Sequence, residues 1–216
     1  MQKIFLSALI FLSLLISACA TSTPQPTPEV VSVYSSSFTQ PWLTDVYDCA
    51  AASSAVIRLS GSASDAQIVL QIGEPEFLAG FAYQIDEEEI WVVTHRESPI
   101  LNMGRKEVQA LFAGLGDPSI QIWVYASDTD VQVIFDDYVM EGRNVTPLAR
   151  LATTSQQMVD VLDSERQAIG ILPDTWTLKM SGGSHGIYQV ATVPVLALTN
   201  SEPQGSIKEL IACLQK

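Results

Sequence analysis

Three short runs of hydroxyl-bearing residues stand immediately before segments with helical patterning. They are Ser36-Ser37 before Phe38, Ser127-Asp128-Thr129, and Thr154-Ser155. Such residues are preferred N-caps, because their side-chain oxygens accept bonds from backbone N–H groups that have no partner within the helix. The same free N–H groups can bind an anion. Taken singly, each run is explained equally well by a plain helix cap and by a ligand-binding loop.

Two carboxylates, Asp128 and Asp130, flank Thr129. A calcium loop would need a glycine and a distal glutamate at fixed offsets, and neither follows. A solvated helix N-cap is therefore the better interpretation of this pair. The only histidines, His95 and His185, have no second ligand at metal spacing. The sequence predicts no metal site.

Catalytic and cofactor motifs are absent. The run Gly182-Gly183-Ser184-His185-Gly186 lacks the strand–helix context of a nucleophile elbow. The phosphate-cradling pattern Gly-x-x-x-x-Gly-Lys-Ser/Thr does not occur. A hydrolase would need a nucleophile with a base in reach, and no such set is found. We therefore expect a protein that is not an enzyme and has no cofactor.

The beginning of the chain has the features of an export signal. An apolar run from Ile4 to Ile16 follows Lys3, and it is shorter than the roughly 20 residues that span a bilayer. The next residues, Ile16-Ser17-Ala18-Cys19, resemble the bacterial lipobox, which implies cleavage after Ala18 and acylation of Cys19. An ordinary signal peptide that ends in a cysteine is the alternative. Residues 19–29 are rich in proline and threonine, and they predict a flexible tether. We expect a membrane-anchored, extracytoplasmic protein, either periplasmic or on the outer face.

Composition favours a folded domain and limits its partners. Of 216 residues, 47% are hydrophobic and 16% are charged, which is typical of a globular chain. The formal net charge is −13 and no basic patch stands out, so we expect no nucleic-acid partner. Cys49 and Cys213 remain besides Cys19, and they form either a disulfide or two buried free thiols.

Strand-like and helix-like segments alternate along the chain, which indicates an α/β protein. The near-continuous apolar runs predict strands of a parallel sheet that is covered on both faces. Expected strands are 30–34, 55–59, 67–72, 90–94, 120–125, 148–153, 168–172 and 190–198, and expected helices are 41–52, 105–112, a helix capped by 127–129, 155–162 and 205–214.

Residues 85–176 resemble the phosphate-binding-protein (PstS-like) branch of the type 2 periplasmic binding proteins. Order and spacing agree over this segment, and the flanks fit less specifically. The matching runs are Trp91-Val92-Val93, Ser98-Pro99-Ile100, Glu107 to Gly114, Ile120 to Tyr125, Ser127 to Gln132, Phe135 to Val139 and Ala168 to Ile171, with Ser36-Ser37-Phe38 and Val193 to Leu198 in the flanks.

The resemblance implies a compact two-lobed fold with mixed sheets flanked by helices. Lobe one would be 30–92 plus 192–216 and lobe two 93–191, so that Cys49 and Cys213 would share a lobe and could pair. A small solute would bind in the cleft between the lobes, and the protein, as a monomer, would deliver it to an ABC transporter. The implied ligand-binding residues are Ser36, Ser37, Phe38, Gln71, Glu74, Ser127, Asp128, Thr129, Thr154 and Ser155.

Several positions depart from the family pattern. The family's phosphate loop carries Gly-Ser-Gly-Thr, and the matching run here is Asp128-Thr129-Asp130-Val131, with Tyr125 at the place of an arginine. The two carboxylates would repel phosphate unless they are protonated or turned outward. Only Glu74 could replace the family's first-lobe aspartate, and the helix between the second and third strands is reduced to 62–65. Phosphate is thus one candidate among small solutes, and a degenerate fold that serves as a surface sensory or protein-interaction module is the alternative.

Overall fold

The computed structural model describes residues 28–216. The predicted signal peptide (1–18), the predicted lipidation site Cys19 and most of the predicted tether (19–29) lie outside the described residues. Within the described part, no helix has the length and apolar character that a membrane span requires.

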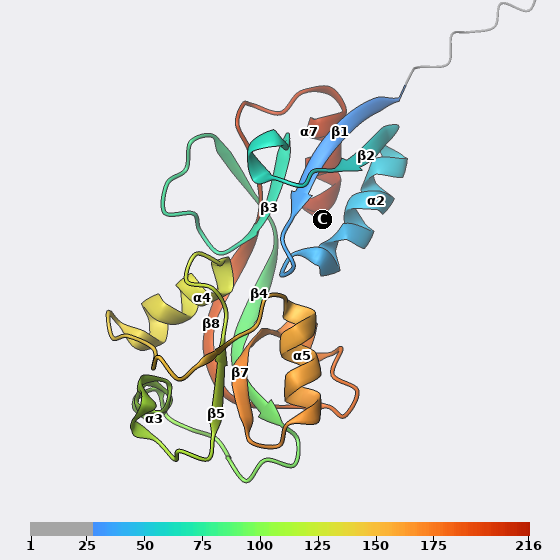
Figure 1. Ribbon diagram of the computed structural model, residues 1–216. Helices are drawn as coiled ribbons and strands as arrows, with labels where there is room; N and C mark the ends of the chain where they lie inside the picture. Colours follow the sequence, from blue (N-terminus) through green and yellow to red (C-terminus); the bar gives the residue numbers. More distant parts are fainter. Residues whose placement is uncertain (1–27) are drawn as a thin grey trace, which may run out of the picture.

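One end of the molecule, here called lobe one, contains the first three strands and the last helix (Figure 1). Strand β1 pairs in parallel with both β2 and β3. Alternate residues of β3 are buried, as expected for a strand with one face on a core. The elements are β1 (Glu29–Ser35), η1 (Gln40–Trp42), α2 (Leu43–Ala52), β2 (Ala55–Leu59), η2 (Ala63–Asp65), β3 (Ile68–Ile72) and α7 (Gly205–Leu214).

The other end, lobe two, contains the middle of the chain. Strand β5 pairs in parallel with β6 and β7. Gly114 adopts φ +81° near the end of the η3 turn, a conformation that glycine reaches without strain. The elements are α3 (Arg105–Ala110), η3 (Leu111–Leu115), β5 (Gln121–Val124), α4 (Asp130–Phe135), η4 (Asp136–Met140), β6 (Arg150–Leu151), α5 (Ser155–Ser164), β7 (Ala168–Pro173) and α6 (Asp174–Thr177).

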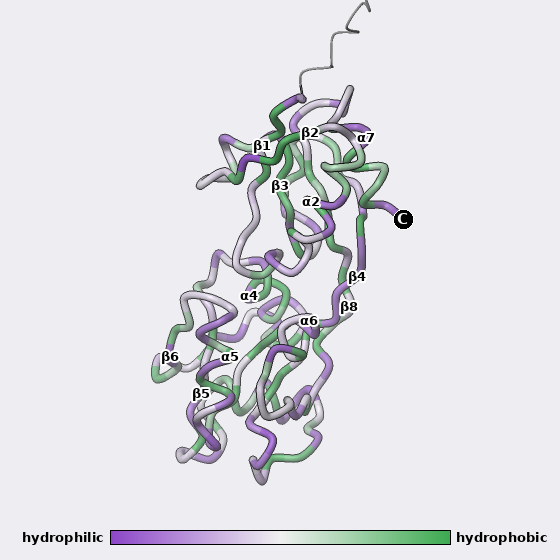
Figure 2. Tube along the Cα trace, turned by 90° about the vertical axis from the view of Figure 1, so that its right-hand side faces the viewer, coloured by the Kyte–Doolittle hydropathy of each residue, from purple (hydrophilic) through white to green (hydrophobic). Residues whose placement is uncertain are grey.

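Two long strands, β4 (Phe81–His95) and β8 (Ser184–Thr199), run through both lobes (Figure 1). They pair antiparallel with each other and lie at the centre of the strand order β2-β1-β3-β8-β4-β7-β5-β6. Figure 2 shows hydrophobic stretches inside each lobe and a hydrophilic stretch of β4 between them. The predicted lobe bounds at 92/93 and 191/192 fall inside these two strands, and the exact bounds remain a prediction.

Some sequence expectations on the elements were wrong. The parallel sheet predicted from the apolar runs is wrong, because β4 and β8 run antiparallel to their neighbours β7 and β3. Both strands also begin well before the expected 90–94 and 190–198. The expected strand 148–153 is only Arg150–Leu151. The mixed sheet that the family resemblance implied is confirmed. The α/β class and the two-lobed arrangement agree with the expectation.

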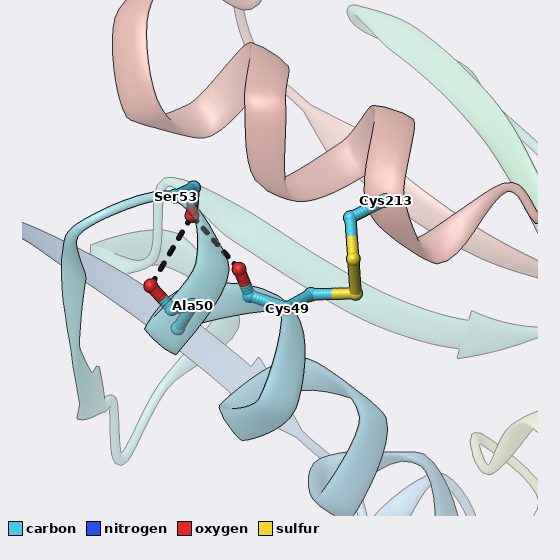
Figure 3. Close-up of a disulfide and its surroundings, with 4 residues drawn as sticks. All are labelled: Cys49, Ala50, Ser53 and Cys213. Carbon is cyan, nitrogen blue, oxygen red and sulfur yellow. Dashed lines mark hydrogen bonds between the residues drawn. A yellow bond between two sulfur atoms is a disulfide. The ribbon is translucent and has the colours of Figure 1, made fainter.

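A disulfide joins the two helices of lobe one (Figure 3). It links Cys49 on α2 to Cys213 on α7, whose Cα atoms are 5.7 Å apart, within the usual range for a disulfide. The Ser53 hydroxyl at the end of α2 donates to the carbonyl oxygens of Cys49 and Ala50. The cross-link therefore ties the beginning of the described chain to its end.

Candidate functional site

The loop after β1 is folded on itself by its hydroxyl groups. The Ser35 and Thr39 hydroxyls are 2.9 Å apart, and the Ser36 hydroxyl accepts a bond from the Phe38 amide at 3.3 Å. Short polar side chains commonly bond to nearby backbone in this way. As a result Phe38 is buried, with 4% of its surface exposed, and its ring faces lobe two.

The end of β3 forms the second part of lobe one that faces lobe two. Gly73 has φ +79°, and its amide donates to the Pro194 carbonyl at 2.8 Å. A Cβ atom at Gly73 would lie 3.0 Å from Ile134 of α4, so α4 approaches the backbone closely here. Gln71 is half-buried, whereas Glu74 is exposed to solvent.

The loop after β5 supplies the facing residues of lobe two. Tyr125 is almost fully buried, and its amide donates to the Gln132 side chain at 3.0 Å. Ser127 and Asp128 are exposed. Helix α4 begins at Asp130 with Thr129 in the N-cap position, but the Thr129 hydroxyl donates backwards to the Ala126 carbonyl at 2.8 Å. The expected capping of this helix by a side chain of the run 127–129 is therefore wrong.

The start of α5 brings a second pair of hydroxyls to the site. Thr154 is the N-cap, and its hydroxyl accepts a bond from the Gln157 amide at 3.1 Å. Ser155 is completely buried. Thr154 thus has the capping role that the sequence left open, and Ser155 turns inward.

Four contacts join the facing loops of the two lobes, and we call this closed surface of contact between the lobes the cleft. The Ser155 and Ser37 hydroxyls are 3.5 Å apart. The rings of Phe38 and Tyr125 meet edge to face at 4.7 Å between centroids. The Trp176 indole N–H donates to the Phe38 carbonyl at 3.2 Å. The Ile72 amide donates to the Asp130 carboxylate at 3.4 Å.

The cleft thus contains some of the predicted residues and some that were not selected. Ser37, Phe38 and Ser155 meet across it, whereas Glu74, Ser127 and Asp128 take no part in the four contacts. Tyr125 and Asp130 are departures from the family pattern, which is the signal that could have selected them. No sequence signal indicates Ile72 or Trp176, because one acts through its backbone and the other lies on the short helix α6.

Two cleft residues, Asp130 and Tyr125, have raised pKa values. Burial raises the pKa of Asp130 to about 6, although the bond from the Ile72 amide opposes this effect. Burial also raises the pKa of Tyr125, and the neighbouring Ser155 hydroxyl opposes it. Perturbed groups that face each other in a cleft are typical of functional sites, although packing alone can produce them.

Two carboxylates of β4 anchor the strand to both lobes beside the cleft. Asp86 accepts a bond from the Trp42 indole at 2.9 Å. The buried Glu88 accepts bonds from the Thr175 amide at 3.2 Å and the Thr175 hydroxyl at 2.7 Å. Burial raises the pKa of Glu88, and the two bonds from Thr175 reduce the effect.

Among residues 28–216, no group of three or more His, Cys, Asp or Glu side chains is arranged to hold a metal ion. The surface pockets described for this part of the chain lie within single lobes or beside the β4 strand, away from the four cleft contacts. The pocket beside the disulfide has a volume of about 450 Å³ and is lined by Trp42, Asp45, Cys49 and Asp86 among others.

Solved structures resemble this chain closely in fold and weakly in sequence. A protein from Clostridium perfringens, assigned as a phosphate ABC transporter substrate-binding protein and solved with bound phosphate, has a TM-score of 0.73 at 13% identity, covering 86% of this chain and 93% of that one. An ABC-type phosphate transport receptor from Vibrio cholerae has a TM-score of 0.62 at 14% identity, with coverage of 86% and 93%.

A regulatory domain is also similar. The CcmR regulatory domain from Synechocystis PCC6803, solved with 2-PG, has a TM-score of 0.66 at 7% identity, covering 87% of this chain and 96% of that one. No protein-family model matches the sequence. No curated protein matches it either.

These similarities establish the fold and leave the function open. The chain has the type 2 periplasmic-binding-protein-like fold, a mixed α/β sheet flanked by helices. The similar structures are ligand-binding proteins and regulatory domains by name, and none of the three is named as an enzyme. Function must therefore be argued from the cleft.

Proposed function

We propose that this protein is a lipid-anchored, extracytoplasmic solute-binding protein that delivers a small solute to an ABC importer. The observation that carries the proposal is the cleft, where hydroxyl and aromatic side chains of two separate lobes face each other. Ser37 and Phe38 come from one lobe and Tyr125 and Ser155 from the other. Ligand sites are commonly concave, mostly apolar and fitted with a few convergent polar groups.

The two connecting strands support a binding role. Because β4 and β8 both pass between the lobes, a bend in two strands is enough to separate the cleft surfaces and admit a solute. The importer as partner is supported by the likeness to two proteins that are named as ABC phosphate transport components. The protein would act as a monomer, and it would bind rather than convert its solute.

The membrane anchor is proposed from the sequence. The apolar run 4–16 and the lipobox-like residues before Cys19 support export and acylation. Strand β1 begins at Glu29, so the fold starts where the proline-rich tether ends. Labelled palmitate should be incorporated by the full chain and not by its Cys19→Ala variant. Equal labelling of both chains would contradict the anchor.

A thermal-shift screen tests the solute-binding proposal. Residues 20–216, which contain every described element, are mixed with phosphate, other oxyanions, sugars, amino acids and amines. A ligand at a hundred times its dissociation constant adds about 2.7 kcal/mol of stability. Saturable binding of one class supports the proposal, and no response to any class contradicts it.

A second function has support of its own. The regulatory domain of CcmR has the same fold, and the cleft surfaces here already contact each other. A degenerate binding fold that acts as a surface sensory or protein-interaction module would have both features. It predicts no response in the solute screen and a specific protein partner, which cross-linking on intact cells would identify.

A further inference from the structure

The cleft contains a carboxylate whose hydrogen-bonding capacity is mostly unused. Asp130 is half-buried, and its side chain accepts one bond from another residue, the Ile72 amide, at 3.4 Å. An ionised carboxylate can accept about four bonds. A carboxylate removed from water is stabilised chiefly by a positive charge or by several donors. Asp130 therefore has room for a donor that the protein itself does not supply.

The described residues provide no cationic side chain to neutralise Asp130. Their ion pairs join arginines to Glu97, Glu141 and Glu165, and none of these residues takes part in the four cleft contacts. Lys179 is the basic residue that contacts a cleft side chain, and its ammonium lies 3.7 Å from the centre of the Trp176 ring. No ion pair connects Lys179 with Asp130 in the described part of the chain. Anions would thus meet a negative charge in the cleft.

A second unused polar group lies close by in the same loop. The Tyr125 hydroxyl is buried beside the Ser155 hydroxyl, and the geometry between them does not make a hydrogen bond. Tyr125 packs against Phe38 of lobe one, so this hydroxyl belongs to the surface that would be uncovered when the lobes separate. Buried hydroxyls without a partner are costly, and a ligand that pairs with one relieves that cost.

We propose that the cleft binds a small organic cation, with an ammonium group of the solute on the Asp130 carboxylate and its carbon skeleton against Phe38 and Tyr125. The inference rests on the proposed solute-binding function and names its ligand class. The ring faces of Phe38 and Tyr125 suit an alkylammonium group, and the Tyr125 and Ser155 hydroxyls supply further polar contacts. The proposal predicts that phosphate does not bind, because the Asp130 carboxylate would repel it and already accepts the bond from the Ile72 amide.

A set of probes with one skeleton and different charges tests the ligand class. Putrescine, 1,4-butanediol and succinate share four carbons and carry two ammonium groups, no charge and two carboxylates. Lysine and choline extend the cations, and inorganic phosphate is the anionic reference. Isothermal titration at pH 7.5 should show saturable binding of at least one cation and none of succinate or phosphate. Binding of phosphate or succinate, or no binding of any cation up to 10 mM (about a hundredfold above a Kd of 0.1 mM), overturns the inference.

Matched variants test the role of Asp130. Asp130→Asn keeps the size and one acceptor oxygen but removes the charge, and it should weaken cation binding at least tenfold. Asp128→Asn removes the charge of an exposed neighbour and should change the affinity less than twofold. Equal effects of the two variants would refute the assignment. If Asp130→Asn does not fold, the charge series on the unaltered protein still decides the ligand class.

The outcome also separates this inference from the broader proposal. A sugar or an uncharged amino-acid derivative that binds in the thermal-shift screen, with no response to cations, keeps the solute-binding function and rejects the cation. If no solute of any class binds, both the cation inference and the solute-binding proposal are rejected.

Discussion

At the scale of single residues, Asp130 is held in a position that does not suit its charge. Burial raises the pKa of Asp130 to about 6, so the folded protein binds this proton more tightly than the unfolded chain does. The resulting contribution to stability is complete below about pH 4 and is lost as the pH rises through about 6. At neutral pH, the folded protein carries the cost of a poorly solvated carboxylate.

We therefore predict that Asp130→Asn stabilises the protein at pH 7.5 by on the order of 2 kcal/mol, because the amide needs no charge to be buried and can still accept the Ile72 bond. The gain should shrink towards zero at pH 4, where the aspartate of the parent protein is protonated. Urea unfolding at the two pH values measures both. The control Asp128→Asn should change stability by less than about 0.5 kcal/mol. A loss of stability in Asp130→Asn at pH 7.5 would show that the ionised carboxylate is favourable where it lies.

The candidate site was partly predictable at this scale. The sequence marks loops that precede helices, and two of them, at Ser37 and Ser155, do meet across the cleft. It does not give the direction of each side chain. Thr154 turns back to cap its own helix, and Asp128 points to solvent while Asp130 faces Ile72. The direction of Asp130 goes with the close approach of α4 to Gly73, which is a tertiary contact.

At the scale of elements, helices and buried strands followed their sequence patterns, whereas the strands between the lobes did not. Helix α7 was expected at 205–214 and is Gly205–Leu214. The first part of β4 includes Asp86-Glu87-Glu88-Glu89, and such a run of acids has low β-propensity. It is extended because β8 pairs with it along its length. The sequence alone cannot show a pairing between segments that lie about a hundred residues apart.

The Glu88 carboxylate links β4 to α6, and its removal tests this link. Glu88→Ala should lower the free energy of unfolding by about 2 kcal/mol, because it leaves the Thr175 amide and hydroxyl without their acceptor. Glu88→Gln keeps one acceptor oxygen and should cost less. Urea unfolding measures both variants against Glu87→Ala, which removes an exposed neighbour. A Glu87→Ala loss as large as that of Glu88→Ala would mean that the acidic run matters as a whole.

The disulfide between α2 and α7 closes a loop with a sequence separation of 164 residues. The double variant Cys49→Ser/Cys213→Ser should lose roughly 2–5 kcal/mol, chiefly because the unfolded chain regains freedom. Urea unfolding without reductant measures the loss, and the parent protein with dithiothreitol should approach the stability of the variant. A difference below about 1 kcal/mol would show that packing of the two helices suffices.

At the scale of the whole molecule, two lobes share two strands, and the cleft contacts decide how far apart the lobes stand. The edge-to-face contact of Phe38 with Tyr125 and the bond from Trp176 to the Phe38 carbonyl both involve one residue of lobe one. Within β4, Asp86 bonds to Trp42 of lobe one, and Glu88 bonds to Thr175 of lobe two. We therefore expect β4 to bend between Asp86 and Glu88 when the lobes separate.

This arrangement predicts that Phe38→Ala separates the lobes without unfolding either one. Phe112 offers a matched control, because it is fully buried and its ring contacts Phe135 within lobe two at 4.6 Å. Both Phe→Ala changes should cost about 3 kcal/mol of stability. Only Phe38→Ala should increase the radius of gyration in small-angle X-ray scattering, since of these two phenylalanines Phe38 alone contacts the other lobe. An unchanged radius in Phe38→Ala, or an equal increase in Phe112→Ala, would show that the Phe38 contacts do not set the separation of the lobes, and that the two strands and the remaining contacts at Ser37 and Asp130 hold them together.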